Sequence, residues 1–301
     1  MIITSRAPVR IDFAGGWTDV DIFAKSVGGA VLNATIDKYV TGRLEIRDGS
    51  IGEDGKYQDG ITISYHSDLP AGSGLGTSSA LNVVWLSLVK SRIASMEDKK
   101  VIANLAYELE AILGILGGKQ DQYASALGGF NYMVFGDEVK VEQLNIRPEV
   151  VEELEERLVL CYTGKQRLSG NIHENVWGAY KRGVPSTVNA LYSLRDIAGA
   201  ARNALVAGDL DEFAYLINQN WECQKKLDKS ITNDQIEQLF EEAFKHGAVS
   251  GKACGAGGGG CLLFLTKPGG RHSVEEVIER LGSRIIPFKF EFGGLQINSI
   301  G

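Results

Sequence analysis

The sequence predicts an α+β protein built from two lobes. Its first half begins with segments of alternating apolar residues, which indicate strands, and continues with long stretches of helical spacing. Its closing part alternates strand, strand, helix and strand, a pattern typical of α+β domains. A chain of 301 residues is long enough for one large domain or two intimately packed ones, and we favour two lobes.

The individual elements are predicted from these periodicities and from the positions of glycine and proline. Strands are expected at residues 2–13, 29–36, 39–47, 61–67, 129–135, 139–144, 158–162, 248–254, 260–266 and 285–292. Helices are expected at residues 20–26, 77–92, 96–116, 120–126, 148–157, 171–182, 186–207, 210–226, 233–246 and 273–281. Gly117 and Gly118 are expected to end the 96–116 helix, because glycine commonly terminates helices. The glutamate-rich segment 148–157 separates an N-terminal domain, residues 1–155, from a C-terminal domain, residues 156–301.

The most informative stretch, residues 70–80, is a loop of glycine and hydroxyl side chains that opens an apolar helix. A helix N-terminus presents unpaired backbone N–H groups and partial positive charge to an anion, and glycines allow the backbone to approach a polyphosphate. The loop is neither a Walker A motif, since no lysine follows the glycines, nor the dinucleotide fingerprint. The alternative is an ordinary turn with Thr77 or Ser78 as the N-cap. The candidate nucleotide-binding residues are Gly72, Ser73, Gly74, Leu75, Gly76, Thr77, Ser78 and Ser79.

Two carboxylates, Glu110 and Asp121, stand eleven residues apart on either side of a predicted helix end. Phosphoryl transfer requires a phosphate cradle, a divalent cation, a group that positions or deprotonates the attacking hydroxyl, and a nearby positive charge. We interpret Glu110, together with Ser78, as a Mg²⁺ site and Asp121 as the group that accepts the proton of the hydroxyl or orients it. The alternative is that Glu110 is solvent-exposed and Asp121 caps the following short helix.

Charged residues near the N-terminus form a second candidate cluster. Arg10 and Asp12 lie two residues apart on the first strand, so their side chains share a face and form either an ion pair or part of a site. Asp19 follows a glycine turn, where a carboxylate can bind vicinal sugar hydroxyls, although it could instead form an Asx turn or cap the 20–26 helix. Gly16, Thr18 and Asp19 are therefore candidate substrate-binding residues.

Residues 255–260 contain five glycines and one alanine between two apolar strands. A backbone so free of side chains suits close approach to a ligand or to the 72–79 loop, and an ordinary hairpin turn rarely needs so many glycines. Gly257 and Gly258 are candidate substrate-binding residues for this reason.

The composition excludes several functional classes. The net charge of −7 and the absence of a dense Lys/Arg cluster argue against nucleic-acid binding. No apolar run reaches the roughly 18 residues that a membrane span requires, and we expect a cytoplasmic protein without a membrane partner. A homo-oligomer remains open, because the sequence does not define the oligomeric state.

Three separated motifs, at residues 8–19, 72–80 and 252–261, resemble those of the GHMP kinases, the family of galactokinase, homoserine kinase, mevalonate kinase and phosphomevalonate kinase. The resemblance implies an N-terminal domain like domain 2 of ribosomal protein S5 and a ferredoxin-like C-terminal domain, with ATP and substrate between them. It also implies that Ser78 and Glu110 bind magnesium, that Asp121 is the catalytic aspartate and that Arg10 faces it and the γ-phosphate. Asp19 is similar to the sugar-binding aspartate of galactokinase-like members.

Within the family, the segments 13–19, 29–37 and 117–123 look closest to the D-glycero-D-manno-heptose 7-phosphate kinases, which phosphorylate the anomeric hydroxyl. A phosphorylated substrate requires a basic partner, for which Lys119, Lys165 and Arg167 are candidates, although each could be a solvated surface residue. Trp17 is more reminiscent of fucokinase-type sequences. The open alternatives are a fucokinase- or galactokinase-like kinase of an unphosphorylated sugar, a kinase of a non-sugar hydroxyl, and a catalytically silent sugar-sensing homologue.

Overall fold

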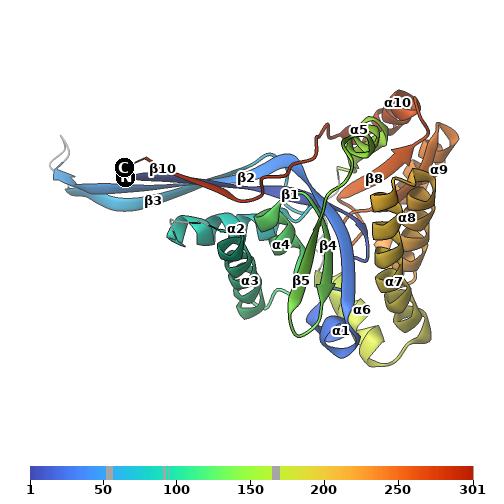
Figure 1. The fold of residues 1–301 in the computed structure, drawn as a ribbon, viewed down its shortest axis with the longest axis horizontal. Helices are drawn as coiled ribbons and strands as arrows, with labels where there is room; N and C mark the ends of the chain where they lie inside the picture. The colour runs from blue at the N-terminus through green and yellow to red at the C-terminus, as the bar shows by residue number, and fades with distance from the viewer. Residues whose placement is uncertain (52–56, 91–92, 94, 165–169, 301) are drawn as a thin grey trace.

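Two antiparallel sheets form the scaffold of the computed structural model, which describes residues 1–51, 57–90, 93, 95–164 and 170–300. The first sheet has the strand order β10-β1-β2-β4-β5, and β3 pairs with β2 (Figure 1). Its strands are β1 (Ile2–Ala14), β2 (Gly29–Ile51), β3 (Tyr57–Ser67), β4 (Phe130–Phe135), β5 (Val139–Leu144) and β10 (Gln296–Ile300). The second sheet, in the order β7-β8-β6-β9, consists of β6 (Leu158–Tyr162), β7 (Ala248–Ala253), β8 (Cys261–Thr266) and β9 (Arg284–Ile285).

Helices cover both faces of the first sheet. The helices are α1 (Asp21–Val27), α2 (Thr77–Lys90), α3 (Met96–Ile112), α4 (Gln120–Leu127), α5 (Pro148–Arg157), α6 (Gly170–Lys181), α7 (Pro185–Ala207), α8 (Leu210–Lys225), α9 (Asp234–Lys245) and α10 (Arg271–Arg280). Helices α2 and α4 pack on one face of β1 and β2, and α7 and α8 lie on the other side (Figure 1). Because α8 also contacts β7, it joins the two sheets, and the predicted α+β class is confirmed.

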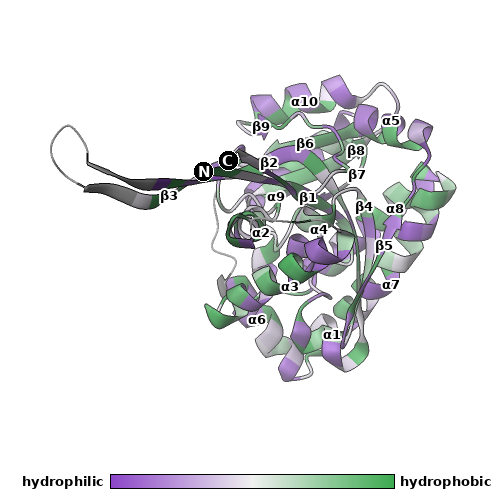
Figure 2. Cartoon of the chain, turned by 60° about the vertical axis from the view of Figure 1, so that its left-hand side comes forward, coloured by the Kyte–Doolittle hydropathy of each residue, from purple (hydrophilic) through white to green (hydrophobic). Residues whose placement is uncertain are grey.

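The second sheet is mostly apolar. Strands β6 and β8 carry predominantly hydrophobic residues, and all six residues of β8 are buried (Figure 2). Helices α9 and α10 pack against this sheet and bury their apolar faces in the same core. The burial of apolar surface between these layers holds the sheet against the helices.

A long arm extends from the body of the first sheet (Figure 1). It is formed by β2, which runs for 23 residues, with β3 and the terminal strands alongside it. The two strands expected at 29–36 and 39–47 are therefore one continuous strand. The two ends of the chain lie side by side, because Ile2 of β1 pairs with Ile300 of β10. Strand β10 therefore belongs to the first sheet. The domain boundary at 155/156 stays a prediction.

The helix expected to run to residue 116 ends earlier, and Gly117 and Gly118 do not terminate it. Helix α3 ends at Ile112, followed by Gly114 with φ 74°. The N–H of Ile115 donates to the carbonyl of Glu110 (2.9 Å) and that of Gly114 to Ala111 (3.1 Å), which is a Schellman arrangement. The first available glycine therefore ends the helix and leaves residues 115–118 free to line a pocket.

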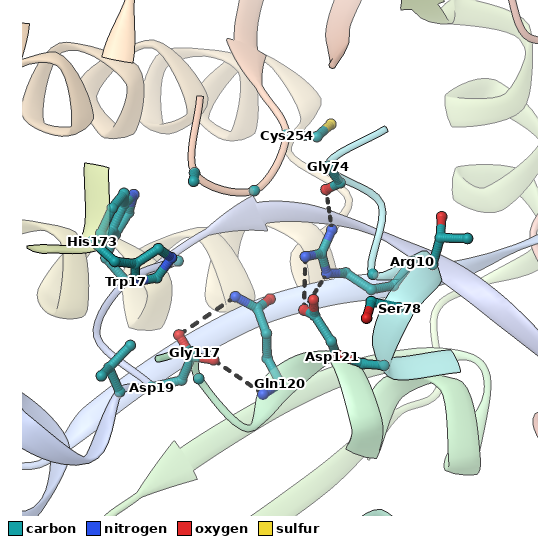
Figure 3. A pocket seen from close by; sticks show the side chains of 18 of the residues that line it. Arg10, Trp17, Asp19, Gly74, Ser78, Gly117, Gln120, Asp121, His173 and Cys254 are labelled. Carbon is teal, nitrogen blue, oxygen red and sulfur yellow. Dashed lines mark hydrogen bonds and ion pairs between the residues drawn. The ribbon is translucent and has the colours of Figure 1, made fainter. Parts of the chain in front are cut away.

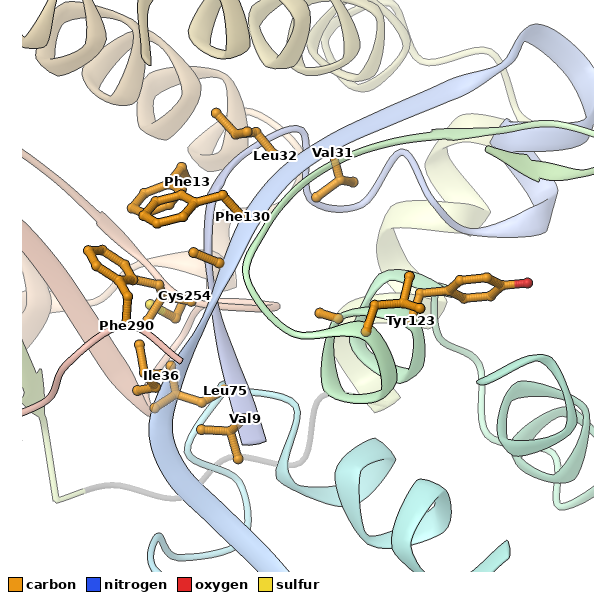
Figure 4. Packing of buried hydrophobic residues seen from close by; sticks show 14 of the residues in the cluster. Val9, Phe13, Val31, Leu32, Ile36, Leu75, Tyr123, Phe130, Cys254 and Phe290 are labelled. Atoms are coloured by element: carbon orange, nitrogen blue, oxygen red, sulfur yellow. The ribbon is translucent and has the colours of Figure 1, made fainter. Parts of the chain in front are cut away.

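The strand expected at 285–292 is wrong beyond its first residue. Only Arg284–Ile285 pairs as β9, and Phe290 forms an isolated bridge with Ile36. The alternating residues Phe288 and Phe290 are buried between elements instead of forming a ladder, and Phe290 packs on Phe130, with ring centroids 4.5 Å apart (Figure 4). Strand β10, which follows this segment, was not predicted because it is short and largely polar.

Candidate active site

A pocket lies where the first sheet, α2, α3, α4 and the turn between β7 and β8 come together (Figure 3). It is lined by most of the 72–79 loop, by residues 115–118, by the start of α4 and by much of the 255–259 turn. Arg10 reaches it from β1, Asp19 from the segment before α1, and His173 from α6. Segments that are far apart in the sequence thus contribute to one site.

The two glycine-rich segments pack directly against each other. A Cβ on Gly74 would lie 2.7 Å from the carbonyl oxygen of Cys254, and one on Gly260 would lie 2.7 Å from that of Ser73. Gly74 and Gly76 adopt left-handed φ values of 79° and 76°, so glycine is required there for conformational as well as steric reasons. The close approach suggested by the bare 255–260 turn is present.

The candidate binding residues of these two segments differ in their exposure and in whether they line the pocket. Leu75 is fully buried and anchors the loop in the core, whereas Ser78 is exposed in the first turn of α2. Gly257 lines the pocket, and the N–H of Gly258 donates to the carbonyl of Ile231 (2.6 Å), which fixes the turn.

Arg10 and Asp121, which both line the pocket, form an ion pair in which Arg10 is buried and Asp121 is partly exposed. The Arg10 Nε and Nη2 atoms lie 2.8 and 2.7 Å from Asp121 Oδ1, and Nη1 donates to the carbonyl of Gly74 (2.7 Å) (Figure 3). The Asp121 side chain therefore does not cap α4, and through Arg10 it is linked to Gly74 of the 72–79 loop. One guanidinium group joins the loop to the carboxylate and fixes the position of both.

A second ion pair lies beneath this one. Lys252 of β7 is fully buried, and its ammonium group donates to the carboxylate of Asp12 and to the Asp12 carbonyl oxygen (2.8 Å). Asp12 also accepts from the N–H of Gly255 (3.1 Å) and lies 3.8 Å from the guanidinium of Arg10. Lys252 was not among the predicted site residues, although a lysine inside an otherwise apolar strand was a signal that it has a buried partner.

Glu110 is buried rather than solvated. Its carboxylate accepts hydrogen bonds from Ser79 (2.9 Å), Asn82 (2.9 Å) and Gln122 (2.8 Å). Burial raises the pKa of Glu110, and these hydrogen bonds act in the opposite direction. Ser79, rather than Ser78, contacts Glu110, because consecutive residues of a helix point about 100° apart and Ser79 turns toward α3.

Glu110 and Ser78 offer the kind of oxygen ligands that Mg²⁺ requires. No group of three or more His, Cys, Asp or Glu side chains in the described ranges is placed to hold a metal by itself. Mg²⁺ usually binds through one or two carboxylates together with water and substrate phosphate oxygens. Glu110 lines the pocket with an Oε2 atom that accepts one hydrogen bond, and Ser78 lines it as well, so both can contribute ligands.

Asp19 lies at the other end of the pocket from Ser78 (Figure 3). Its carboxylate accepts from the backbone N–H of Gln120 (3.0 Å) and from the Gln120 side chain (3.5 Å). Burial raises the pKa of Asp19 to about 6, although the backbone hydrogen bond from Gln120 acts to lower it. A buried carboxylate with few partners is a good acceptor for ligand hydroxyl groups.

Two neighbours of Asp19 support the turn. Gly16 lines the pocket, and a Cβ there would lie 2.9 Å from Asp12 Oδ2. Thr18 is fully buried, and its hydroxyl donates to the carbonyl of Gly15 (2.7 Å) and accepts from the N–H of Ala30 (3.0 Å). Thr18 therefore holds the backbone of the turn, and its side chain is engaged within the protein.

Lys119, the one basic candidate within the described residues, does not line the pocket. Lys119 is buried with its ammonium group 2.9 Å from Asp21 Oδ1 and 4.7 Å from the centre of the Tyr107 ring. Its side chain is therefore held between the start of α1 and α3, and Lys119 is not among the residues that line the pocket. Lys165 and Arg167 lie outside the described residues.

Two family models match the chain: the GHMP kinases N terminal domain at residues 39–129 and the GHMP kinases C terminal domain at residues 201–285. The chain belongs to the GHMP kinase family and is a phosphotransferase that acts on a sugar. It is 32% identical to the D-glycero-alpha-D-manno-heptose 7-phosphate kinase of Campylobacter jejuni, over 98% of both chains. The predicted family and fold are confirmed.

The chain is also similar to a solved structure and to a further curated protein. The solved structure of a D-glycero-D-manno-heptose 1-phosphate kinase from Bacteroides thetaiotaomicron has a TM-score of 0.76 and 28% identity, covering 99% of both chains. The bifunctional fucokinase/GDP-fucose pyrophosphorylase of Arabidopsis thaliana is 27% identical over 91% of this chain and 30% of its own length.

No helix in the described part of the chain has the length and apolarity to span a bilayer.

Replacing Gly118 with alanine should weaken sugar binding. A Cβ on Gly118 would lie 1.8 Å from Asp19 Oδ2, so the carboxylate must move out of its position. We expect the KM for the sugar to rise about tenfold or more, on the scale of one lost charged hydrogen bond. Gly117→Ala is the matched control, because a Cβ there has no neighbour within 4 Å among the described residues. Equal steady-state KM values for the two variants would contradict the expectation, drawn from the sequence, that Asp19 binds the sugar.

Proposed function

We propose that this protein is an ATP- and Mg²⁺-dependent kinase that transfers the γ-phosphate to the anomeric hydroxyl of D-glycero-D-manno-heptose 7-phosphate. The observation that carries the proposal is the position of Asp121, which Arg10 holds between the glycine-rich loop and Asp19. The similarity to a heptose 7-phosphate kinase along nearly the whole chain supports the choice of sugar. With ATP as the proposed co-substrate, we also propose a cytoplasmic location.

In this proposal different residues of the chain bind the nucleotide, bind the sugar and accept the proton. The loop at residues 72–79, within the proposed ATP-binding domain of residues 1–155, receives the triphosphate at the N-terminus of α2. Asp19 accepts hydrogen bonds from sugar hydroxyls and sets the direction in which the acceptor enters. Asp121 accepts the proton of the attacking hydroxyl or orients it, and the Arg10 guanidinium compensates negative charge beside it.

Mg²⁺ would be held by Glu110 and Ser78 together with nucleotide phosphate oxygens. When bound, it would neutralise the charge of the transferring phosphoryl group. Ser79, Asn82 and Gln122 fix the Glu110 carboxylate in one orientation, so little ordering is needed when the metal arrives.

A kinase of an unphosphorylated sugar is the second candidate. The observation that favours it concerns the basic side chains of the pocket. Apart from the imidazole of His173, Arg10 is the one basic side chain among the described residues that line the pocket. Arg10 is already paired with Asp121. A buried phosphate dianion requires basic partners, and Lys119 is engaged with Asp21. The outcome depends on whether a phosphorylated or a free sugar is the better substrate.

A substrate screen tests the proposal. The protein is assayed with Mg-ATP against heptose 7-phosphate, mannose, fucose, galactose and arabinose, and the product is examined by ³¹P NMR. We expect the highest kcat/KM with heptose 7-phosphate and a new anomeric phosphate signal coupled to one proton. A higher kcat/KM with a free sugar would reject the proposal in favour of the second candidate.

The pH dependence of sugar binding should report Asp19. Burial favours the protonated form of this carboxyl, with a pKa of about 6 in the free protein, whereas sugar hydroxyls donate to the ionised form. We therefore expect kcat/KM for the sugar to rise as the pH increases through about 6. The Asp19→Asn variant should lose this step and retain any step that comes from the substrate's own phosphate. A step of unchanged size in Asp19→Asn would contradict the prediction.

A further inference from the structure

The sugar end of the pocket contains an aromatic cluster to which the proposed reaction assigns no role. Trp17 and His173 both line the pocket, and their ring centroids are 4.5 Å apart (Figure 3). Trp177 lies behind them, with its ring centroid 6.1 Å from that of Trp17. The cluster lies on the same side of the pocket as Asp19, away from Ser78 (Figure 3).

The hydrogen bond between Trp177 and His173 fixes the tautomer of the imidazole. Trp177 Nε1 lies 3.3 Å from His173 Nδ1, and because an indole nitrogen can only donate, Nδ1 must accept. The single proton of a neutral imidazole is then on Nε2, which becomes a donor. Burial lowers the pKa of His173 to about 4, so the ring is neutral near pH 7. His173 therefore offers one N–H donor, on the side of the ring opposite Trp177.

Trp17 holds the imidazole in place at a conformational cost. It has φ 79° and is the only non-glycine residue with a positive φ in the described ranges. Residues held in this region concentrate at functional sites, where the surrounding structure enforces them. Here the strained backbone places a large, buried indole directly against His173.

Further polar atoms at this end of the pocket lack partners. Trp17 Nε1 and Gln120 Oε1 are buried without a hydrogen-bond partner in the part of the chain that the structure describes. Both atoms belong to residues that line the pocket, so the protein's own hydrogen bonding is incomplete at this end of it. Asp19 supplies acceptors and His173 a neutral donor, a set that matches vicinal hydroxyls better than an anion.

We propose that His173 is a substrate-binding residue whose Nε2–H donates a hydrogen bond to an oxygen of the acceptor sugar, with Trp17 and Trp177 fixing the orientation of the ring. This inference rests on the proposed function only in taking a sugar as the ligand. Asp19 and His173 then hold the sugar from two sides and turn its reacting hydroxyl toward Asp121. A donor held in one position favours sugars that have an oxygen within its reach and disfavours sugars that do not. His173 therefore contributes to the choice among sugars.

Two substitutions separate this role from a structural one. The amide oxygen of His173→Asn can take the place of Nδ1 and keep the bond from Trp177, but the variant has no group at the position of Nε2. The longer His173→Gln places its amide nitrogen near the position of Nε2 and gives up the bond from Trp177. We expect the KM for the sugar to rise about 5- to 10-fold in His173→Asn and by less than about twofold in His173→Gln, with the KM for ATP unchanged in both.

Controls make the result decisive. His272→Asn, on the exposed face of α10, should leave both KM values unchanged. Thermal unfolding of each variant is measured in parallel, because a purely structural His173 would make His173→Gln the less stable and the less active variant. That reversed order, or an unchanged sugar KM in His173→Asn, would overturn the proposal.

The two proposals fail in different ways. The KM values are measured with whichever sugar the wild-type protein phosphorylates best. If that sugar is not heptose 7-phosphate, the proposed function is rejected, whereas a selective loss of affinity in His173→Asn still supports the inference. If the wild-type protein binds no sugar by calorimetry in the presence of a non-hydrolysable ATP analogue, both are rejected.

Discussion

Replacing Asp121 with asparagine is expected to lower kcat by about 10²- to 10⁴-fold while the affinity for ATP changes little. Both contacts from Arg10 go to Asp121 Oδ1, and an asparagine oxygen can occupy that position, so the fold and the loop should be preserved. What is lost is the negative charge and the ability to accept a proton from the attacking hydroxyl. Steady-state kinetics, with ATP binding measured by calorimetry, checks this expectation.

A matched control is available on the surface. Asp196 of α7 is exposed and pairs only with its neighbour Arg195 among the described residues, so Asp196→Asn should behave as wild type. A fully active Asp121→Asn variant would remove the assigned role. A variant that loses kcat and ATP affinity together would instead assign Asp121 to nucleotide binding.

Replacing Lys252 with methionine is expected to lower the free energy of unfolding by about 3–5 kcal/mol. Methionine can occupy much of the lysine side chain's volume, but it leaves the buried carboxylate of Asp12 without its main partner. Removing one member of a buried ion pair is costly because the remaining charge stays desolvated. Urea unfolding with linear extrapolation measures the change.

The comparison with an exposed lysine isolates the effect of burial. Lys245→Met removes ion pairs on the surface of α9 and should change the free energy of unfolding by less than about 0.5 kcal/mol. The double variant Asp12→Asn with Lys252→Met should be less destabilised than the sum of the single variants, since neither charge is then left alone. Additive single effects would show that the two side chains do not stabilise each other.

The sequence was sufficient for features that depend on neighbouring residues. The bounds of α5 and β6 match the predicted segments, because proline, glutamates and a short apolar run mark them locally. The start of α2 at Thr77 was predicted from the glycine loop that precedes it, whereas anion binding by that loop stays a prediction. These properties follow from steric and electrostatic effects within a few residues of the chain.

The site was predicted in part. Arg10, Asp19, Glu110 and Asp121 were predicted as site residues in two separate clusters, and the structure brings all four to one pocket. The partners that hold them were not predicted: Ser79 and Gln122 for Glu110, and Lys252 for Asp12. His173 carried no signal in the sequence, because its position depends on how α6 packs beside a turn more than 150 residues earlier.

The sequence by itself determined the alternation of strands and helices, the glycine-rich loop before α2 and the set of acidic residues that the structure brings to the pocket. Only the tertiary structure decided that β10 returns to the first sheet, that Lys119 turns to Asp21 and that Lys252 lies beneath the site. The physical reason is that secondary structure and loop chemistry are set by short-range sterics and hydrogen bonding, whereas the pairing of buried charges depends on which distant surfaces exclude water together.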